Sequence, residues 1–191
     1  MRSPITTVYQ LKIALVGVRP QIWRRVQVPA DIALDELHLV LQAAMGWTNS
    51  HLHSFAFGKQ EYTMPYEQGD LEELRMEDER KMCMSALISN PKETFEYAYD
   101  FGDNWQHVIT LEKILPAAQD TKYPLCIAGK RACPPEDCGG VWGYADLLRV
   151  LRNPAHPEYK DMKAWAGRKF DAEVFDVDRF SKDLRKLRSY L

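Results

Sequence analysis

The stretch YAYDFGDNWQH, residues 97–107, decides how this chain folds. Aromatic residues alternate with small or polar ones on both sides of Phe-Gly-Asp, which predicts two antiparallel strands joined by a tight turn. We expect Gly102 and Asp103 to form a two-residue turn, because glycine accepts the positive φ that it requires. The letters D-F-G do not indicate a kinase, since the chain lacks the glycine-rich loop and the H-R-D motif of that fold.

This hairpin register places the polar side chains on defined faces of the sheet. Asp100 faces Trp105, so His107 is a diagonal neighbour of Asp100 within side-chain reach. Asp100 and His107 are therefore candidate catalytic residues, with the carboxylate orienting the imidazole as a base or a metal ligand. Alternatively, Asp100 caps the turn and His107 is an ordinary half-buried residue. The opposite face is expected to carry Tyr97, Tyr99 and Phe101.

Period-two patterns predict further strands. Residues 8–16 and 21–28 alternate on either side of a turn at Pro20, and residues 51–64 form a third hairpin. The segment 115–140 is rich in proline and glycine and is expected to hold no long regular structure.

Helical spacing appears once early in the chain and again at its end. Asp31 is the expected N-cap of a helix that ends at Gly46. Residues 65–80 are acidic and predict an exposed loop or insertion. Strands first and helices last predict a single α+β domain over residues 1–191, built on an antiparallel sheet of hairpins with one early helix and a C-terminal helical group.

Composition is ordinary for a soluble globular protein, with 46% hydrophobic and 27% charged residues and a net charge of −2. This balance gives no global attraction to nucleic acid or to anionic lipid. No stretch is long enough to cross a bilayer, and no export signal precedes the four cysteines. The sequence therefore predicts a cytoplasmic protein with reduced thiols and no membrane partner.

Histidines and cysteines give two candidate metal sites. His51 and His53 lie two residues apart on an expected strand and project from one face, with His107 as a possible third ligand. Cys133 and Cys138 in C-P-P-E-D-C form a weaker candidate, because two prolines stiffen the loop. We favour neither site and predict no cofactor, zinc being the ion that either would suit.

The motif I-W-R-R sets two arginines on opposite faces of a strand. A buried arginine requires a carboxylate, for which Asp100, Asp103 and Glu136 are the candidates. Asp100 in turn needs a partner among Arg24, Arg25 and the turn amides. Glu136 either caps the helix entered through Gly139 and Gly140 or acts as a third catalytic candidate.

The last helix bears a basic set of side chains that predicts at most weak, non-specific contact with nucleic acid, although cations near a helix C-terminus are also expected from the dipole. No other partner is indicated. The set comprises Arg179, Lys182, Arg185, Lys186 and Arg188.

Five blocks, P-Q-I-W-R-R, L-H to M-G-W, H-L-H-S-F, the stretch 97–107 and C-P-P-E-D-C-G-G-V-W-G-Y, occur in an order that resembles the Ri-plasmid "ORF three"-like family, also labelled transposon passenger protein. The resemblance covers about residues 8–184. It implies an accessory role near plasmids or mobile elements and brings no established activity or substrate.

Two functions remain open on this basis. The first is a non-catalytic binding or accessory domain with an aromatic cleft. The second is a metal-dependent or acid–base enzyme, hydrolase-like, that uses the His/Asp cluster. The residues expected to line the cleft and bind the ligand are Trp23, Arg25, Trp47, His53, Tyr99 and Trp105.

Overall fold

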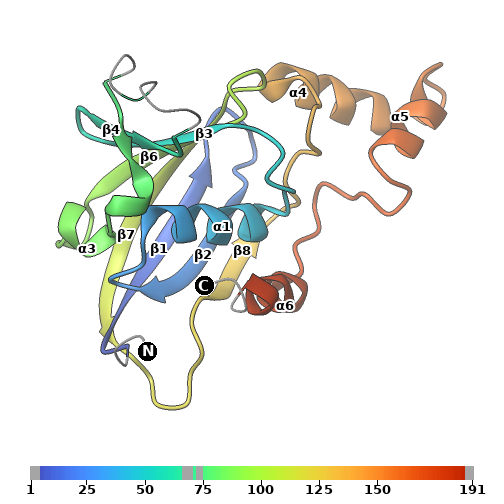
Figure 1. The fold of residues 1–191 in the computed structure, drawn as a ribbon. Helices are drawn as coiled ribbons and strands as arrows, with labels where there is room; N and C mark the ends of the chain where they lie inside the picture. The colour runs from blue at the N-terminus through green and yellow to red at the C-terminus, as the bar shows by residue number, and fades with distance from the viewer. Residues whose placement is uncertain (1–4, 66–70, 72–74, 188–191) are drawn as a thin grey trace.

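An eight-stranded sheet forms the centre of the computed structural model, which describes residues 5–65, 71 and 75–187 (Figure 1). The strand order is β5-β4-β3-β6-β7-β1-β2-β8, and every neighbouring pair is antiparallel except β4 and β5. The predicted α+β class is therefore confirmed, with one short parallel pair added. The strands are β1 Thr7–Leu15, β2 Trp23–Pro29, β3 His53–Phe57, β4 Gln60–Thr63, β5 Glu77–Asp78, β6 Thr94–Tyr99, β7 Trp105–Pro116 and β8 Leu125–Lys130.

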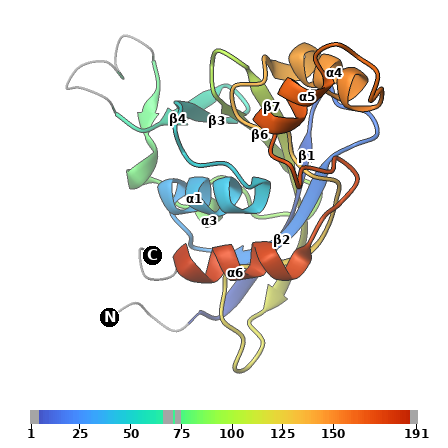
Figure 2. The ribbon, with the colours of Figure 1, turned by 90° about the vertical axis from the view of Figure 1, so that its right-hand side faces the viewer.

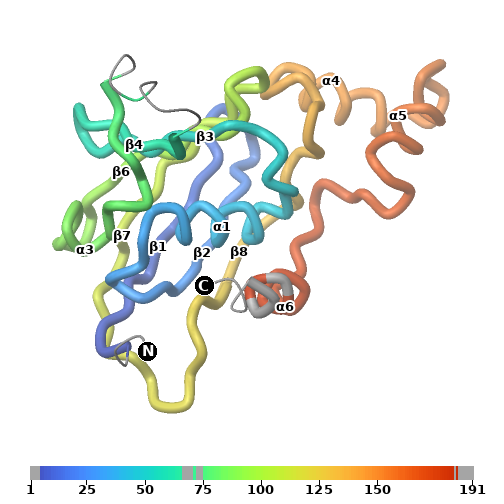
Figure 3. The backbone as a smooth tube through the Cα atoms, in the orientation of Figure 1, coloured from blue at the N-terminus to red at the C-terminus, as the bar shows by residue number. Residues whose placement is uncertain are grey.

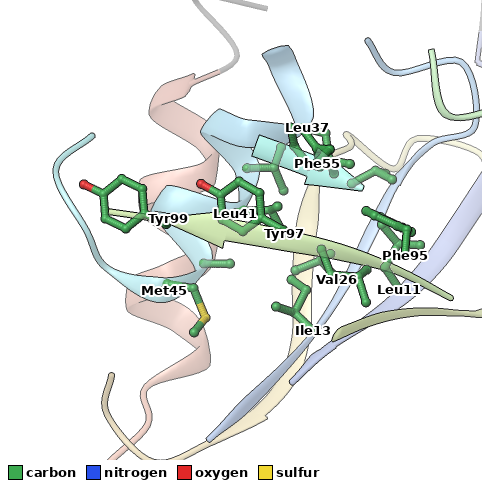
Figure 4. Packing of buried hydrophobic residues seen from close by; sticks show 14 of the residues in the cluster. Leu11, Ile13, Val26, Leu37, Leu41, Met45, Phe55, Phe95, Tyr97 and Tyr99 are labelled. Atoms are coloured by element: carbon green, nitrogen blue, oxygen red, sulfur yellow. The ribbon is translucent and has the colours of Figure 1, made fainter. Parts of the chain in front are cut away.

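Helix α1, Leu34–Met45, covers one face of this sheet and creates the core. Leu37, Leu41 and Met45 are buried at successive turns and face the inward side chains of the strands (Figure 4). Full burial of each such side chain contributes about 2 kcal/mol. Tyr97 and Tyr99 belong to the same core and present their hydroxyl oxygens toward one side of it.

The C-terminal helices divide between two places. Helix α6, Val177–Leu187, lies beside α1 on the same face of the sheet (Figure 2). Helices α4, Gly140–Leu151, and α5, Tyr159–Trp165, pack on each other at the upper right of the backbone trace (Figure 3). A four-residue helix, α3 Met84–Leu87, and the short 3₁₀ helix η1, Glu79–Lys81, complete the described elements.

None of the helices within the described residues is both long enough and apolar enough to cross a membrane.

Several sequence predictions need correction at their boundaries. Ala33 rather than Asp31 is the N-cap of α1, whereas Gly46 ends the helix with a φ of 88°, as expected. The segment 115–140, expected to hold no long regular structure, contains the six-residue strand β8. The acidic loop lies largely outside the described residues, and its described end forms β5 and the start of η1. Arg188 also lies outside them, as do the side chains of Arg185 and Lys186.

The predicted register of the decisive hairpin is wrong by one residue. Tyr99 pairs with Trp105 and Tyr97 with His107, so all four side chains share the inner face of the sheet. Residues 100–104 form a longer turn in which Asp100 and Asn104, not Gly102, take positive φ values of 56° and 53°. Asp100 therefore leaves the strand, and Phe101 is 51% exposed.

Arg24 departs most clearly from expectation. Its side chain is fully buried, yet among the described residues its hydrogen-bond acceptors are the carbonyl oxygens of Ala44, Trp23 and Lys130 and the sulfur of Cys133 rather than a carboxylate. The guanidinium also lies over the rings of Phe175 and Phe180, at 4.2 and 5.1 Å from their centroids. Several carbonyl dipoles and two aromatic faces together replace the expected counter-ion.

Gly143 in the first turn of α4 allows the loop before this helix to fold back tightly. A Cβ atom at this position would overlap the carbonyl oxygen of Cys138. Alanine normally stabilises a helix relative to glycine by about 0.5–1 kcal/mol. For Gly143→Ala we expect the opposite sign, a loss of more than about 1 kcal/mol of unfolding free energy in urea denaturation. Equal or greater stability would show that this loop is not tightly constrained.

Candidate functional site

The loop that follows α1 is attached to the core through Trp47. Its indole stacks on Tyr99 at 4.9 Å between centroids, and its Nε1 donates to the carbonyl oxygen of Pro134 at 3.0 Å. Trp47 thus joins the end of α1 to the proline loop, residues 133–137. Polar residues on both segments are brought to the end of the sheet at which β6 turns into β7.

Glu136, on the proline loop, connects the two segments through hydrogen bonds that its carboxylate accepts. Its carboxylate accepts from the backbone N–H of Thr48 at 3.1 Å, from the Thr48 hydroxyl and from Tyr99 Oη at 2.6 Å. Partial burial opposes ionisation, but these hydrogen bonds outweigh it and lower the pKa of Glu136. Burial, followed by the Glu136 carboxylate, raises the pKa of Tyr99. Glu136, one of the candidates for a catalytic residue, is therefore ionised at neutral pH and joins the proline loop to Thr48 and Tyr99.

Beside this pair, three side chains converge, and we call them the His-Asp-Asp cluster: His51, Asp100 and Asp137. His51 Nε2 lies 3.0 Å from Asp137 Oδ1 and 3.7 Å from Asp100 Oδ2. One potential ligand atom from each residue lies within 4.8 Å of the other two. His51 Nε2 is buried and makes no aligned hydrogen bond with any described residue, despite these short distances. The cluster is the principal candidate site.

Turn geometry holds Asp100 in the cluster. Its Oδ1 accepts from the amides of Gly102 and Asp103 at 3.0 and 3.3 Å, which confirms the predicted partnership with turn amides. Its Oδ2 is left to face His51. Asp103 Oδ2 accepts from the amide of Gly139 at 3.1 Å and connects this turn to the proline loop. Two loops distant in sequence are therefore fixed against each other.

His107 is not part of this cluster. Its side chain is 1% exposed, and its Nδ1 donates to the carbonyl oxygen of Tyr97 at 3.1 Å. Burial is the main cause that lowers the pKa of His107 to about 4. The predicted Asp100–His107 pair does not form, because the longer turn carries Asp100 away from the strand that holds the histidine.

His53 also turns away from the predicted metal site. It begins β3 and is buried, with its Nε2 at 3.0 and 2.8 Å from the two carboxylate oxygens of Glu79. His51 precedes the strand, so the two histidines do not share a strand face as predicted. Among the predicted histidine ligands, only His51 reaches a cluster of potential ligand atoms.

The weaker cysteine site receives no support from the thiol chemistry. Cys133 is buried and accepts a hydrogen bond from Arg24 at 3.2 Å. Burial is the largest cause that raises the pKa of Cys133 to about 11 and that of Cys138 to about 12. Burial therefore favours the protonated thiols in the metal-free protein, and neither cysteine belongs to a group of potential metal ligands among the described residues.

The predicted aromatic cleft does not form as a single site. Trp23 lies on the outer face of the sheet with Arg25, whose guanidinium pairs with Glu112 at 2.5 Å. Trp105 is 1% exposed and belongs to the core. Of the residues expected to bind ligand, Trp47 borders an open groove.

That groove, which we call the apolar groove, has a volume of about 750 Å³. It lies between the end of α1, the proline loop and the segment that leads into α6. Its apolar wall includes Trp47, Pro134, Phe170, Val174 and Phe180.

Sequence reasoning missed Thr48, Asn49 and Asp137 as site residues. Asp137 was not among the predicted site residues, and it takes a positive φ of 58° before the start of α4. Thr48 and Asn49 follow M-G-W, where the end of a helix was the only evident signal. The grouping of short polar residues after a helix stop is the one feature that could have indicated them.

Comparison with known proteins agrees with the fold. A family model described as "Plasmid pRiA4b ORF-3-like protein" matches residues 7–179. An uncharacterised protein, y4hQ of Sinorhizobium fredii, is 38% identical over 180 residues, covering 93% of this chain and 91% of that protein. The crystal structure of MM3350, a protein of unknown function from Methanosarcina mazei, has a TM-score of 0.83 and 42% identity, covering 92% of this chain and 98% of that one.

Acidification should destabilise the protein through His38 and His107. Burial is the main cause that lowers the pKa of His38 to about 3 and of His107 to about 4. Unfolded histidine protonates near pH 6.5, so stability is fully present above that pH and falls between pH 6.5 and 3–4. Each pH unit within this window should remove about 1.4 kcal/mol per histidine.

Urea denaturation at pH 7, 6 and 5 measures this dependence. His38→Gln and His107→Gln should each make the loss of unfolding free energy with falling pH less steep. His156→Gln serves as the control, because His156 lies in the loop before α5 rather than in the core. An unchanged slope in both core variants would contradict the assignment.

Proposed function

The chain belongs to the plasmid pRiA4b ORF-3-like family, and we propose that it is a binding domain whose His-Asp-Asp cluster holds a divalent metal ion. The observation that carries this proposal is the convergence of three potential ligand atoms within 4.8 Å around a histidine nitrogen that makes no aligned hydrogen bond. The plasmid origin in the family description supports an accessory role in plasmid biology.

The donor set indicates the class of ion. One imidazole nitrogen and two carboxylate oxygens suit borderline and hard divalent cations such as Mn²⁺, Zn²⁺ and Mg²⁺. Ligand bonds of about 2.0–2.2 Å place neighbouring ligand atoms about 3–3.5 Å apart. The separations from His51 Nε2, 3.0 and 3.7 Å, are close to that range. Two carboxylates around one imidazole also provide the negative charge that a cation compensates.

The exposure of the His-Asp-Asp cluster allows a metal ion to bind from solution. The Asp137 side chain is 72% exposed, whereas the Asp100 side chain is 11% exposed. An ion would therefore be held by one buried carboxylate, that of Asp100, and one exposed carboxylate, that of Asp137. Other positions around the ion would stay open to water or to a ligand, where the metal could act as a Lewis acid.

The acid–base enzyme alternative has less support. Asp100 and His107 are separated, and Glu136 accepts hydrogen bonds from Thr48 and Tyr99. No pair among these groups offers a base within reach of an accessible proton. Metal binding is thus the one part of that alternative which the geometry favours.

The apolar groove supports a second candidate function, the binding of an apolar molecule with one anionic group. Its volume of about 750 Å³ suits a small organic ligand. Asp171 and Asp176 on its wall accept from local amides at 2.9 and 3.0 Å. Within the described residues, no carboxylate pairs directly with Lys169 or Arg179, so both side chains can donate hydrogen bonds to an anionic group of the ligand.

Metal binding is tested with Mn²⁺ by isothermal titration calorimetry and electron paramagnetic resonance. Wild-type protein should bind one ion, and His51→Gln and Asp137→Asn should each weaken binding by at least about tenfold. Asp146→Asn is the matched control, since that exposed carboxylate pairs only with Arg149 on α4. Absence of binding in the wild type, or wild-type affinity in both cluster variants, would refute the proposal.

Groove binding is tested by fluorescence titration with 1-anilinonaphthalene-8-sulfonate. The double variant Lys169→Gln/Arg179→Gln should bind the probe at least about fivefold more weakly, because two favourable charge interactions are removed. Lys160→Gln on α5 is the control. Octanoate should displace the probe better than octylamine, and equal displacement by both would argue against an anion-selective groove.

A further inference from the structure

A closed set of hydrogen bonds fixes the loop that carries His51, and we call it the His38 network. It contains Gln42 and His38 from α1, Tyr97 from β6 and Asn49 from the loop. Asn49 N donates to Gln42 Oε1 at 3.0 Å, and Gln42 Nε2 donates to Tyr97 Oη at 3.0 Å. Tyr97 Oη lies 2.8 Å from His38 Nδ1, and His38 Nε2 lies 2.6 Å from Asn49 Oδ1.

Proton positions in the His38 network follow from its chemistry. The Gln42 amide nitrogen can only donate, so Tyr97 Oη accepts from it and directs its own hydrogen to His38 Nδ1. His38 then carries its proton on Nε2 and donates to Asn49 Oδ1. A neutral His38 in this tautomer satisfies every contact in the network and gives the Tyr97 hydroxyl hydrogen an acceptor.

A second pair of side chains fixes the plane of the His38 ring. The His53 imidazole stacks on it with 3.5 Å between centroids and 6° between planes. His53 is in turn held by Glu79, which is fully buried. The His38 ring therefore cannot tilt without disturbing β3 and η1.

The network reaches the cluster through the loop backbone. Asn49 is bound at both its amide and its side chain and takes a positive φ of 57°. The next amide, Ser50 N, donates to Tyr99 Oη at 3.0 Å, and His51 follows directly. Consecutive backbone positions before the histidine are thus attached to α1 and β6.

We infer that Asn49 and His38 are positioning residues that hold His51 where its Nε2 meets the two aspartates. The inference deepens the proposed function, because it rests on metal binding for its purpose while the positioning can be measured without metal. The alternative is that the His38 network only stabilises the end of α1.

The test compares two changes at one exposed position. Asn49→Gly keeps the positive φ but removes the acceptor oxygen, whereas Asn49→Asp keeps both. Asn153→Gly in the loop between α4 and α5 is a control remote from the cluster. Tyr97→Phe breaks the network from inside and leaves the loop sequence unchanged, and thermal melts establish that each variant is folded.

Two readouts separate the alternatives. In metal-free protein, Asn49→Gly should raise amide hydrogen exchange at residues 48–51 by about tenfold or more, while Asn49→Asp and Asn153→Gly should not. Mn²⁺ affinity should fall about tenfold or more in Asn49→Gly and Tyr97→Phe and be retained in Asn49→Asp.

Unchanged exchange in Asn49→Gly would overturn the inference. Faster exchange with wild-type Mn²⁺ affinity would also overturn it, since the network would then serve stability alone. If wild-type protein binds no Mn²⁺, the proposed function fails, and the exchange and its rescue by Asn49→Asp alone decide whether His51 is positioned by this network.

Discussion

The rest of the molecule depends on how the buried guanidinium of Arg24 is satisfied without a carboxylate partner among the described residues. Arg24 Nε donates to Ala44, one of the last-turn carbonyls of α1 that no helical amide can reach. A cation at the negative end of a helix dipole is favourable, and here it also fixes where the helix stops. The same side chain contacts β8 and the rings of Phe175 and Phe180. Helix, sheet edge and C-terminal segment therefore meet at one residue.

Fixing the end of α1 has a direct consequence for the site. Gly46 turns the chain, Trp47 enters the core, and the following polar residues emerge beside the proline loop. The histidines buried behind these polar residues are neutral, because burial keeps His38 and His107 deprotonated. Three carboxylates gather in front of them, those of Asp100, which is buried, Glu136, which is half-buried, and Asp137, which is exposed. The charge of the site therefore comes from its carboxylates and not from the histidines buried behind them.

Local sequence patterns predicted the positions of the strands well, but they predicted less well how the strands and turns pair in space. Alternation identified β1, β2, β6 and β7, because side-chain period reports directly which face is buried. The turn at residues 100–104 was assigned too few residues, since Asp100 stabilises its own positive φ by accepting turn amides, a possibility that sequence alone does not separate from a glycine turn. That single shift moved Asp100 away from His107 and changed the candidate site.

Long-range pairings account for the other differences. Asp100 and Glu136 were recognised as polar residues in important blocks, but no periodicity relates either of them to His51. The expected carboxylate for Arg24 was wrong for a similar reason, because carbonyl groups carry no sequence signature. The proline loop and the loop after α1 meet through tertiary packing of Trp47, and such contacts are visible only once the chain is folded.

The distance in sequence between the two halves of this site also orders events during folding. The bonds from Trp47 to Pro134 and from Thr48 to Glu136 each join residues 87–88 positions apart. Hairpins such as β1–β2 close short loops, whereas these contacts must close a long one and form later. During synthesis, the first sheet strands can therefore pair while the segment that completes the site is still within the ribosome. The site is therefore complete only when most of the chain has folded.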